Sequence, residues 1–266
     1  MADGVAAAVL DDALLSRIED ASLNASAPPQ QFWLDGWIVR TSPGKARRAR
    51  CINAVAKGRL SLERKLALAE ALFREAGLPM VVRLTRFTQP ADLDAQLTHR
   101  AWQRLDETWV MVRPDLADLA PAADASPPPG CAWARLDGTA YADVVGALRG
   151  SPPEQRRAHA ERLASSPVRY EGHALRRLVD GEVLACGQFA REAELVGLYD
   201  VFTRDSARGR GLAGLLCSRL LALASQQGAQ VAYLQTEATN DAARRVYRRL
   251  GFADQYSYHY RQPPGL

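Results

Sequence analysis

The amino-acid sequence predicts an α/β (α+β) protein whose mixed, mostly antiparallel sheet is flanked by helices. Segments with the apolar alternation of strands follow segments with the apolar periodicity of helices along most of the chain. The proline-rich stretch 121–130 interrupts both patterns and is typical of an extended linker. The parts on either side each end in strand, helix, strand, helix, strand, which predicts two domains of similar fold at 1–120 and 131–266.

The composition is that of a globular protein, with 47% hydrophobic and 24% charged residues in a chain of 266. Basic residues exceed acidic ones only by 34 to 30, so we expect no nucleic-acid partner, which would need a clustered basic face. The four cysteines and four histidines show no ligand spacing, so we expect no metal and no disulfide framework, and a cytoplasmic location fits. No uncharged apolar stretch reaches the roughly 18 residues that span a bilayer, so we expect no membrane partner.

The elements of the first half follow from its periodicity and its breakers. In order, we expect a helix over 10–23, strands over 32–41 and 47–55, a helix over 62–76, a strand over 81–84, a helix over 91–102 and a strand over 108–113. The sequence Ser-Pro-Gly at 42–44 is typical of the turn between the first two strands. Gly77 ends one helix, and Pro90 begins the next.

The second half repeats this order in a fuller form. We expect a strand over 133–136, helices over 141–148 and 154–163, strands over 174–179, 183–189 and 195–202, a helix over 212–225, a strand over 231–235, a helix over 241–250 and a strand over 256–260. Asp180 and Gly181 are a typical hairpin turn between the first two strands of the middle group.

A glycine-bearing loop joins the strand at 195–202 to the helix at 212–225. The first backbone N–H groups of a helix have no partner inside it and lie at the positive end of its dipole, so an anion there gains several hydrogen bonds. Gly209 and Gly211 permit positive φ and a close approach by phosphate oxygens. Three arginines add positive charge: Arg204, Arg208 and Arg210. The loop therefore favours a diphosphate ligand, although a plain turn with solubilising arginines has the same composition.

The helix expected at 241–250 carries a second group of candidate residues. Asn240 is a typical N-cap, and Gly251 stands where a left-handed residue ends a helix. Tyr247 lies two turns beyond Asn240 on the same face, about 10 Å along the axis. Ala243 lies between them and leaves room for a flat ligand to approach. The alternative interpretation is an ordinary core tyrosine and a simple cap.

Together these two segments closely resemble the GNAT superfamily of acyl-CoA N-acyltransferases. The loop fills the defining places of its signature Q/R-x-x-G-x-G/A with Arg208, Gly211 and Ala213. Residues 240–252 match its pattern N-x-x-A-x-x-x-Y-x-x-x-G-F. The resemblance covers residues 131–262 and implies a catalytic, acetyl-CoA-binding GNAT domain at 131–266, as part of a tandem GNAT-like arrangement.

The first half then looks like a degenerate GNAT-like domain. In the place of the phosphate loop, residues 56–61 keep one glycine and match no signature. We expect this domain at 1–120 to pack against its partner and to shape the cleft for the acceptor. A polar and aromatic set on its strands is a candidate lining, with core and surface roles as the alternative: Trp37, Arg40, Arg47 and Asn53.

The resemblance also implies roles for individual residues. The backbone amides of the signature loop bind the pyrophosphate of CoA, at Arg208, Gly209, Arg210, Gly211, Leu212 and Ala213. The preceding strand splays from its neighbour at a bulge and offers backbone groups to the pantetheine and the thioester carbonyl, at Asp200, Val201 and Phe202. Asn240 and Ala243 contact the CoA arm. Tyr247 protonates the departing thiolate as the general acid.

The general base has two candidates. An amine is protonated at neutral pH and must lose a proton before it attacks, so a carboxylate or a water chain is expected near the splayed strands. Asp200 and Glu237 are the candidate carboxylates, and the alternative for each is a merely solvated or hydrogen-bonded carboxylate. Gln235 stands where GNAT enzymes that modify protein N-termini often carry a catalytic Glu, and an amide is no base. Gln235 therefore argues against a protein N-terminus as the substrate without excluding it.

The function expected from the resemblance is transfer of an acetyl group from acetyl-CoA to a primary amine of a small molecule or amino acid, by direct attack in a ternary complex. A protein N-terminal or lysine acetyltransferase is one alternative. A non-catalytic acyl-CoA-binding regulatory module is another, which the presence of Tyr247 with Asn240 disfavours. The expected partners are acetyl-CoA and an amine acceptor, with no metal, and a homodimer is kept as an assembly to be tested.

Overall fold

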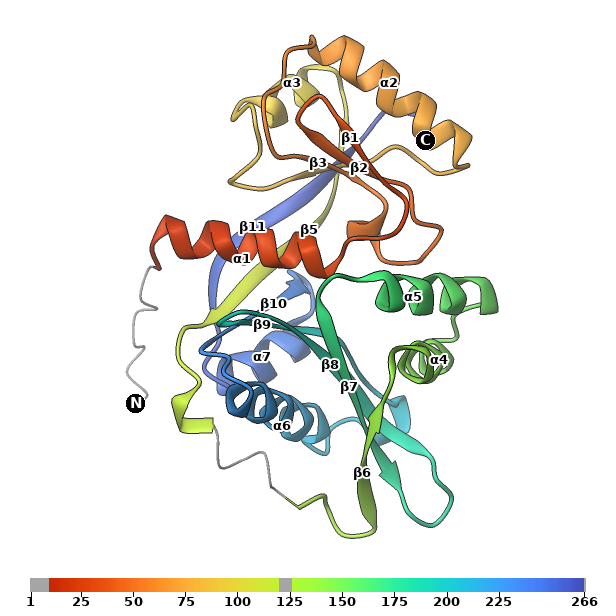
Figure 1. Ribbon diagram of the computed structural model, residues 1–266, viewed down its shortest axis with the longest axis vertical. Helices are drawn as coiled ribbons and strands as arrows, with labels where there is room; N and C mark the ends of the chain where they lie inside the picture. Colours follow the sequence, from red (N-terminus) through yellow and green to blue (C-terminus); the bar gives the residue numbers. More distant parts are fainter. Residues whose placement is uncertain (1–9, 120–125, 266) are drawn as a thin grey trace. The chain divides into compact units, whose positions relative to one another are not determined.

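The computed structural model describes residues 10–119 and 126–265 (Figure 1). Its strands are β1 (Gln31–Leu34), β2 (Trp37–Arg40), β3 (Ile52–Ala54), β4 (Val82–Leu84), β5 (Gln103–Arg113), β6 (Cys131–Leu136), β7 (Arg169–Arg177), β8 (Val183–Glu192), β9 (Leu195–Thr203), β10 (Val231–Glu237) and β11 (Ala253–Gln262). Its helices are α1 (Asp12–Ala25), α2 (Leu62–Glu75), α3 (Leu93–His99), α4 (Gly138–Leu148), α5 (Pro153–Ser165), α6 (Leu212–Gln226) and α7 (Asp241–Arg249), with short 3₁₀ turns η1 (Arg47–Ala49) and η3 (Asp205–Ala207). None of the described helices combines the length and apolar character needed to cross a bilayer.

The chain packs into two compact units that do not follow the order of the sequence. Of the described residues, the first unit comprises those up to Ser22 and those within Trp109–Arg135 and Arg169–Tyr256. The second comprises those within Leu23–Thr108, Leu136–Val168 and Ser257–Leu266. Helices α4 and α5 therefore pack with the second unit although they follow the proline-rich stretch. Residues 120–125 of the expected linker lie outside the described residues, and a domain boundary at 121–130 stays a prediction.

The sheets are mixed and mostly antiparallel. The unit boundaries divide two strands, so that residues 109–113 of β5 and 253–256 of β11 belong to the first unit and the rest of each strand to the second. In the first unit the strand order is β11-β5-β10-β9-β8-β7-β6, with β7, β8 and β9 antiparallel and β10 parallel to β9. In the second unit the order is β1-β2-β3-β4-β11, where only the β3–β4 pair is parallel among the described strands. Helices flank these strands, so the predicted fold class is confirmed.

Helix α6 packs on the sheet of the first unit because its apolar residues recur at helical spacing. Leu216 and Leu220, four residues apart, are fully buried in a cluster with Phe189 of β8 and Leu198 of β9. Burial of one such leucine stabilises the fold by about 1.5–3 kcal/mol. The helix is therefore a rigid support for the loop that precedes it.

Three expected elements of the first half are wrong in their extent. The single strand expected at 32–41 is the two antiparallel strands β1 and β2, because Asp35 and Gly36 turn the chain between them with φ values of 45° and 85°. Residues 47–49 form the turn η1 instead of a strand, because Ala49 N–H donates to the carbonyl of Ala46 at 2.9 Å and Arg50 N–H to that of Arg47 at 3.0 Å. The helix expected at 91–102 ends at His99, since Ala101 adopts a φ of 58° that no helix continues.

The candidate cleft residues of the first half are mostly interior residues of the second unit. Trp37 and Arg40 are each 1% exposed, and Asn53 is buried as well. Arg40 donates hydrogen bonds to the carbonyl of Leu23 at 2.8 Å and to the Gln31 side chain at 2.9 Å. Burial lowers the pKa of Arg40 to about 10, which still leaves it charged at neutral pH. These contacts favour the structural alternative for Arg40.

Candidate active site

Strand β9 carries a bulge in the segment that precedes the glycine loop. Cys186 of β8 pairs with Phe202, whereas Gln188 pairs with Tyr199, so β9 has one extra residue opposite this part of β8. Asp200 lies inside the bulge with a φ of 53°, in the left-handed region that non-glycine residues rarely adopt. The expectation of a bulge at this point is confirmed.

The side chain of Gln188 holds the bulge in place. Gln188 is 1% exposed, and its amide Nε2 donates to Oδ2 of Asp200 at 2.9 Å. The left-handed backbone costs about 1–2 kcal/mol, which a hydrogen bond to a carboxylate is strong enough to offset. Asp200 is therefore fixed by its neighbour, and the sequence contains no pattern that singles out Gln188 for this contact.

The strands β9 and β10 separate near the same place. Their parallel pairing runs from Val231↔Leu195 to Leu234↔Leu198, and no further pair of these two strands is found in the described chain. Both strands continue beyond that point, to Thr203 and Glu237. Beyond these pairs, the backbone N–H and C=O groups of β9 and β10 are therefore not hydrogen-bonded between the two strands.

The loop before α6 has the conformation expected of a phosphate-binding loop. After the turn η3, Gly209 and Gly211 have φ values of 76° and 75°, and Gly211 is the N-cap of α6. A Cβ atom built on either glycine would meet no atom within 4 Å. Space is therefore open beside the α-carbon of both residues at a helix N-terminus, where an anion is favoured.

A cleft of about 590 Å³ brings the two candidate groups together. Its lining includes Val201, Phe202, Arg208, Gly209, Gly211, Leu212, Ala213, Asn240, Ala243 and Tyr247. Candidates that do not line it are Asp200, Arg210 and Glu237. Two segments that lie about 30 residues apart in the sequence thus form the walls of one cavity in the first unit.

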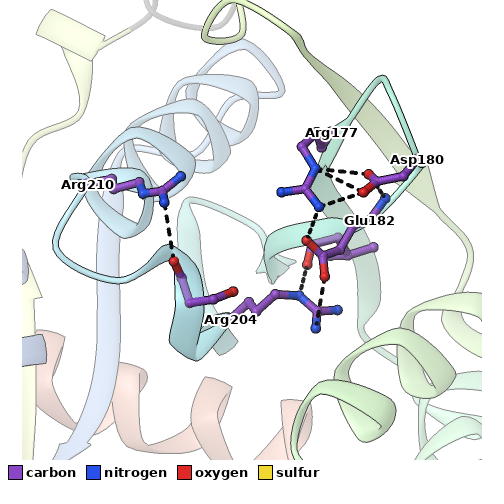
Figure 2. A network of polar contacts seen from close by, with 7 residues as sticks. Arg177, Asp180, Glu182, Arg204 and Arg210 are labelled. Atoms are coloured by element: carbon purple, nitrogen blue, oxygen red, sulfur yellow. Dashed lines mark hydrogen bonds and ion pairs between the residues drawn. The ribbon is translucent and has the colours of Figure 1, made fainter.

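Arg204 and Arg210 of the loop have different partners (Figure 2). Arg204 donates from Nε to the carbonyl of Val183 at 2.8 Å and lies 3.4 Å from Glu182, so its charge serves the β7–β8 hairpin. Arg210 donates to the carbonyl of Ser206 at 3.4 Å and lines a separate hollow. Of the three arginines only Arg208 lines the cleft.

Helix α7 has the expected ends. The Asn240 side chain accepts a hydrogen bond from the backbone N–H of Ala243 at 3.1 Å, so Asn240 is the N-cap. Gly251 follows the helix with a φ of 82°. Tyr247 is partly buried, and its ring meets Phe252 in a T-shaped contact with centroids 6.1 Å apart. The ring of Tyr247 is thus anchored on one side while the residue lines the cleft.

Glu237 lies at the exposed end of β10, whereas Asp200 is partly buried on β9. Neither carboxylate lines the cleft. In the described residues, no group of three His, Cys, Asp or Glu side chains converges as a metal site would require.

Two charged residues of the cleft are not among the candidates named from the sequence. Arg245 and Arg249 of α7 both line the cleft. Their i, i+4 spacing was visible in the sequence, but two further arginines at 244 and 248 share it. Only the contacts of the folded chain separate one pair from the other.

The residues present fit an acyl-CoA. Open left-handed amides at Gly209 and Gly211 suit phosphate oxygens, and Arg208, Arg245 and Arg249 give the lining positive charge without any Asp or Glu among the described residues.

Comparison with known proteins identifies the class to which this fold and cleft belong. A GCN5-related N-acetyltransferase from Kribbella flavida has a TM-score of 0.66 and 19% identity, over 94% of this chain and 96% of that one. A tandem GNAT protein from the clavulanic acid biosynthesis pathway has a TM-score of 0.60 and 16% identity, over 77% and 70%. The uncharacterized N-acetyltransferase YobR of Bacillus subtilis strain 168 is 24% identical over 85% of this chain and 89% of its own. The class is that of the GNAT N-acetyltransferases.

A family model narrows the class further. The model described as "Probable histone acetyltransferase Rv0428c C-terminal" matches residues 13–261, and the chain belongs to this family. The chain is therefore an enzyme, an acetyltransferase of the GNAT type, and acyl-CoA and an acceptor are what enzymes of this type bind.

Proposed function

We propose that this enzyme transfers the acetyl group of acetyl-CoA to a primary amine of a small molecule or amino acid, by direct attack in a ternary complex. The observation that carries the proposal is the single cleft shared by the open glycine loop and Tyr247. The loop suits an anion, and a phenol in the same cleft suits a leaving group that needs a proton. A module that only bound CoA would have no use for the phenol of Tyr247.

Different residues of the chain bind different parts of acetyl-CoA. The backbone amides of residues 208–213 hold the diphosphate at the N-terminus of α6, with Arg208 beside them. Val201 and Phe202 offer backbone groups next to the bulge, where an N–H stabilises the negative charge that develops on the carbonyl oxygen. Asn240 and Ala243 form the opposite wall of the cleft.

Proton transfers complete the reaction. A base first takes one proton from the ammonium form of the acceptor. The C–N bond then forms as the C–S bond breaks, Tyr247 donates its proton to the departing sulfur, and the second proton lost by the nitrogen restores the Tyr247 phenol through solvent. Asp200 and Glu237 stay the two candidate bases. Since neither lines the cleft, each would act through a water molecule or at its outer edge.

The cysteines support direct attack. None of the four lines the cleft in the described chain. Burial raises the pKa of Cys217 to about 12, so its thiol stays protonated and is a poor nucleophile. A covalent acyl-cysteine step therefore has no evident carrier near the glycine loop.

A protein lysine is the second candidate acceptor, because the description of the matching family names histone acetylation. The chemistry at the cleft is the same for both acceptors, and they differ in what must enter beside the thioester.

Release of free thiol from acetyl-CoA, measured with the full chain across a panel of amines, tests the proposal. The panel contains amino acids, polyamines, aminosugars and lysine peptides, including histone tails. We expect acceptor-dependent thiol release with at least one small amine. Release with the peptides alone would move the acceptor to protein lysine. Tight CoA binding without release for any acceptor would favour a non-catalytic binding module and contradict the proposal.

A further inference from the structure

Helix α7 carries four arginines, and their contacts divide them into two pairs. Arg244 and Arg248 both donate to Oδ2 of Asp254, at 2.7 and 2.8 Å. Arg245 and Arg249 line the cleft instead, and within the described residues neither guanidinium has an ion pair or a hydrogen bond. The second pair is therefore available to a ligand of the cleft.

The free pair points away from the proposed acid around the axis of α7. Each residue turns a helix by about 100°, so Arg245 and Arg249, which are each two residues from Tyr247, both point about 160° away from it. Arg245 and Arg249 are four residues apart, about 6 Å along the axis on one side. Arg245, Tyr247 and Arg249 nevertheless line one cleft. A ligand whose reactive end lies at Tyr247 can therefore place a second anionic group at the arginine pair.

The positive charges of Arg245 and Arg249 have no acidic partner among the described residues. Arg208, the third arginine of the lining, has Asp205 as a partner at 2.7 Å. A guanidinium pair without an acid selects an anionic group, and its planar N–H donors match phosphate oxygens well. A terminal phosphate carries about 1.5–2 negative charges at pH 7, which suits two arginines better than one.

We propose that Arg245 and Arg249 form a second anion subsite, which takes the 3′-phosphate of CoA at the end of the donor opposite the thioester. The subsite rests on the proposed function, because it assumes that the donor lies in this cleft. It makes the enzyme selective for acyl groups carried on CoA over the same groups carried on dephospho-CoA, which has the diphosphate but lacks the 3′-phosphate.

Calorimetric titration of the full chain with CoA and with dephospho-CoA tests the subsite. For the unaltered chain we expect CoA to bind about 5- to 30-fold more tightly, the typical value of charge-assisted hydrogen bonds on a partly solvated phosphate. In the double variant Arg245→Ala, Arg249→Ala this ratio should fall to about one, with the dissociation constant of dephospho-CoA nearly unchanged. Arg248→Ala is the matched control, because Arg248 is bound to Asp254 and does not line the cleft, and it should keep the ratio.

The outcomes separate the subsite from the function. An unaltered chain that binds both compounds equally, or a double variant that keeps the preference, would overturn the subsite while CoA binding and acetyl transfer stand. Equal loss of both compounds in the double variant would also overturn it, since the arginines would then serve the fold or the diphosphate. Failure of the unaltered chain to bind either compound would overturn the proposed function itself, and the subsite with it.

Discussion

Asp200 shows how a single residue shapes the cleft. Its φ of 53° bends β9 at the point where β9 and β10 stop pairing, and Gln188 holds its carboxylate from within the sheet. A carboxylate that accepts this bond is an orienting group for the bulge whether or not it also serves as the base. The same residue thus has a structural reason for its identity that the sequence does not reveal.

Gly211 has a left-handed backbone and open space beside its α-carbon. Its replacement by valine tests whether this backbone binds the phosphates of CoA. Gly211→Val should weaken CoA binding by about 10- to 100-fold, because a side chain at φ 75° forces the amide away from the phosphate it would bind. The measurement is the dissociation constant of CoA by calorimetry.

Gly228→Val is the control for backbone strain. Gly228 has a φ of 95° and equally open surroundings, but it follows the C-terminal end of α6 and does not line the cleft. The control should lose comparable stability and keep its CoA affinity. Equal affinity in both variants would show that the phosphates bind elsewhere.

At the scale of elements, the cleft depends on close packing between α6 and β8. Gly187 lies opposite the bulge, and a Cβ there would stand 3.0 Å from Leu220, 3.3 Å from Leu216 and 3.3 Å from Val201. The two leucines are fully buried, so they have little space into which to move. The absence of a side chain at 187 therefore sets the distance between helix and strand.

Gly187→Ala should lower the free energy of unfolding by about 1–3 kcal/mol, the usual cost of overpacking a core. Urea unfolding followed by circular dichroism is the measurement. Gly214→Ala, within α6, is the control: its nearest neighbour would be 3.9 Å away, and alanine gains about 0.5–1 kcal/mol over glycine in a helix. If Gly187→Ala proved as stable as the unaltered chain, α6 would not be held against β8 in the way described.

At the scale of the whole molecule, the site belongs to one compact unit. The loop, α6, α7 and the bulged strand all lie in the first unit, which is assembled from three stretches of the chain. The second unit contains α4 and α5 as well as most of the first half. Periodicity describes one segment at a time, so it predicted these helices but not the unit in which they pack.

The sequence predicted those parts of the site that depend on local chemistry. Asn240 as a cap, Gly211 as a left-handed residue and Gly251 as the end of α7 each follow from a backbone rule that acts over a few residues. The division of the α7 arginines depends on Asp254, and the support of Asp200 depends on Gln188, both of which are contacts between separate elements. Such contacts leave no periodic trace in a single sequence.

The central claim is that the cleft both binds the donor and protonates its leaving group, and Tyr247→Phe tests it most directly. The variant keeps the ring that packs on Phe252 and removes only the hydroxyl. With an acceptor from the amine panel, single-turnover thiol release should slow by about 10- to 1,000-fold while the dissociation constant of acetyl-CoA stays nearly the same. An unchanged rate, with chemistry as the limiting step, would contradict the claim and remove Tyr247 from the reaction.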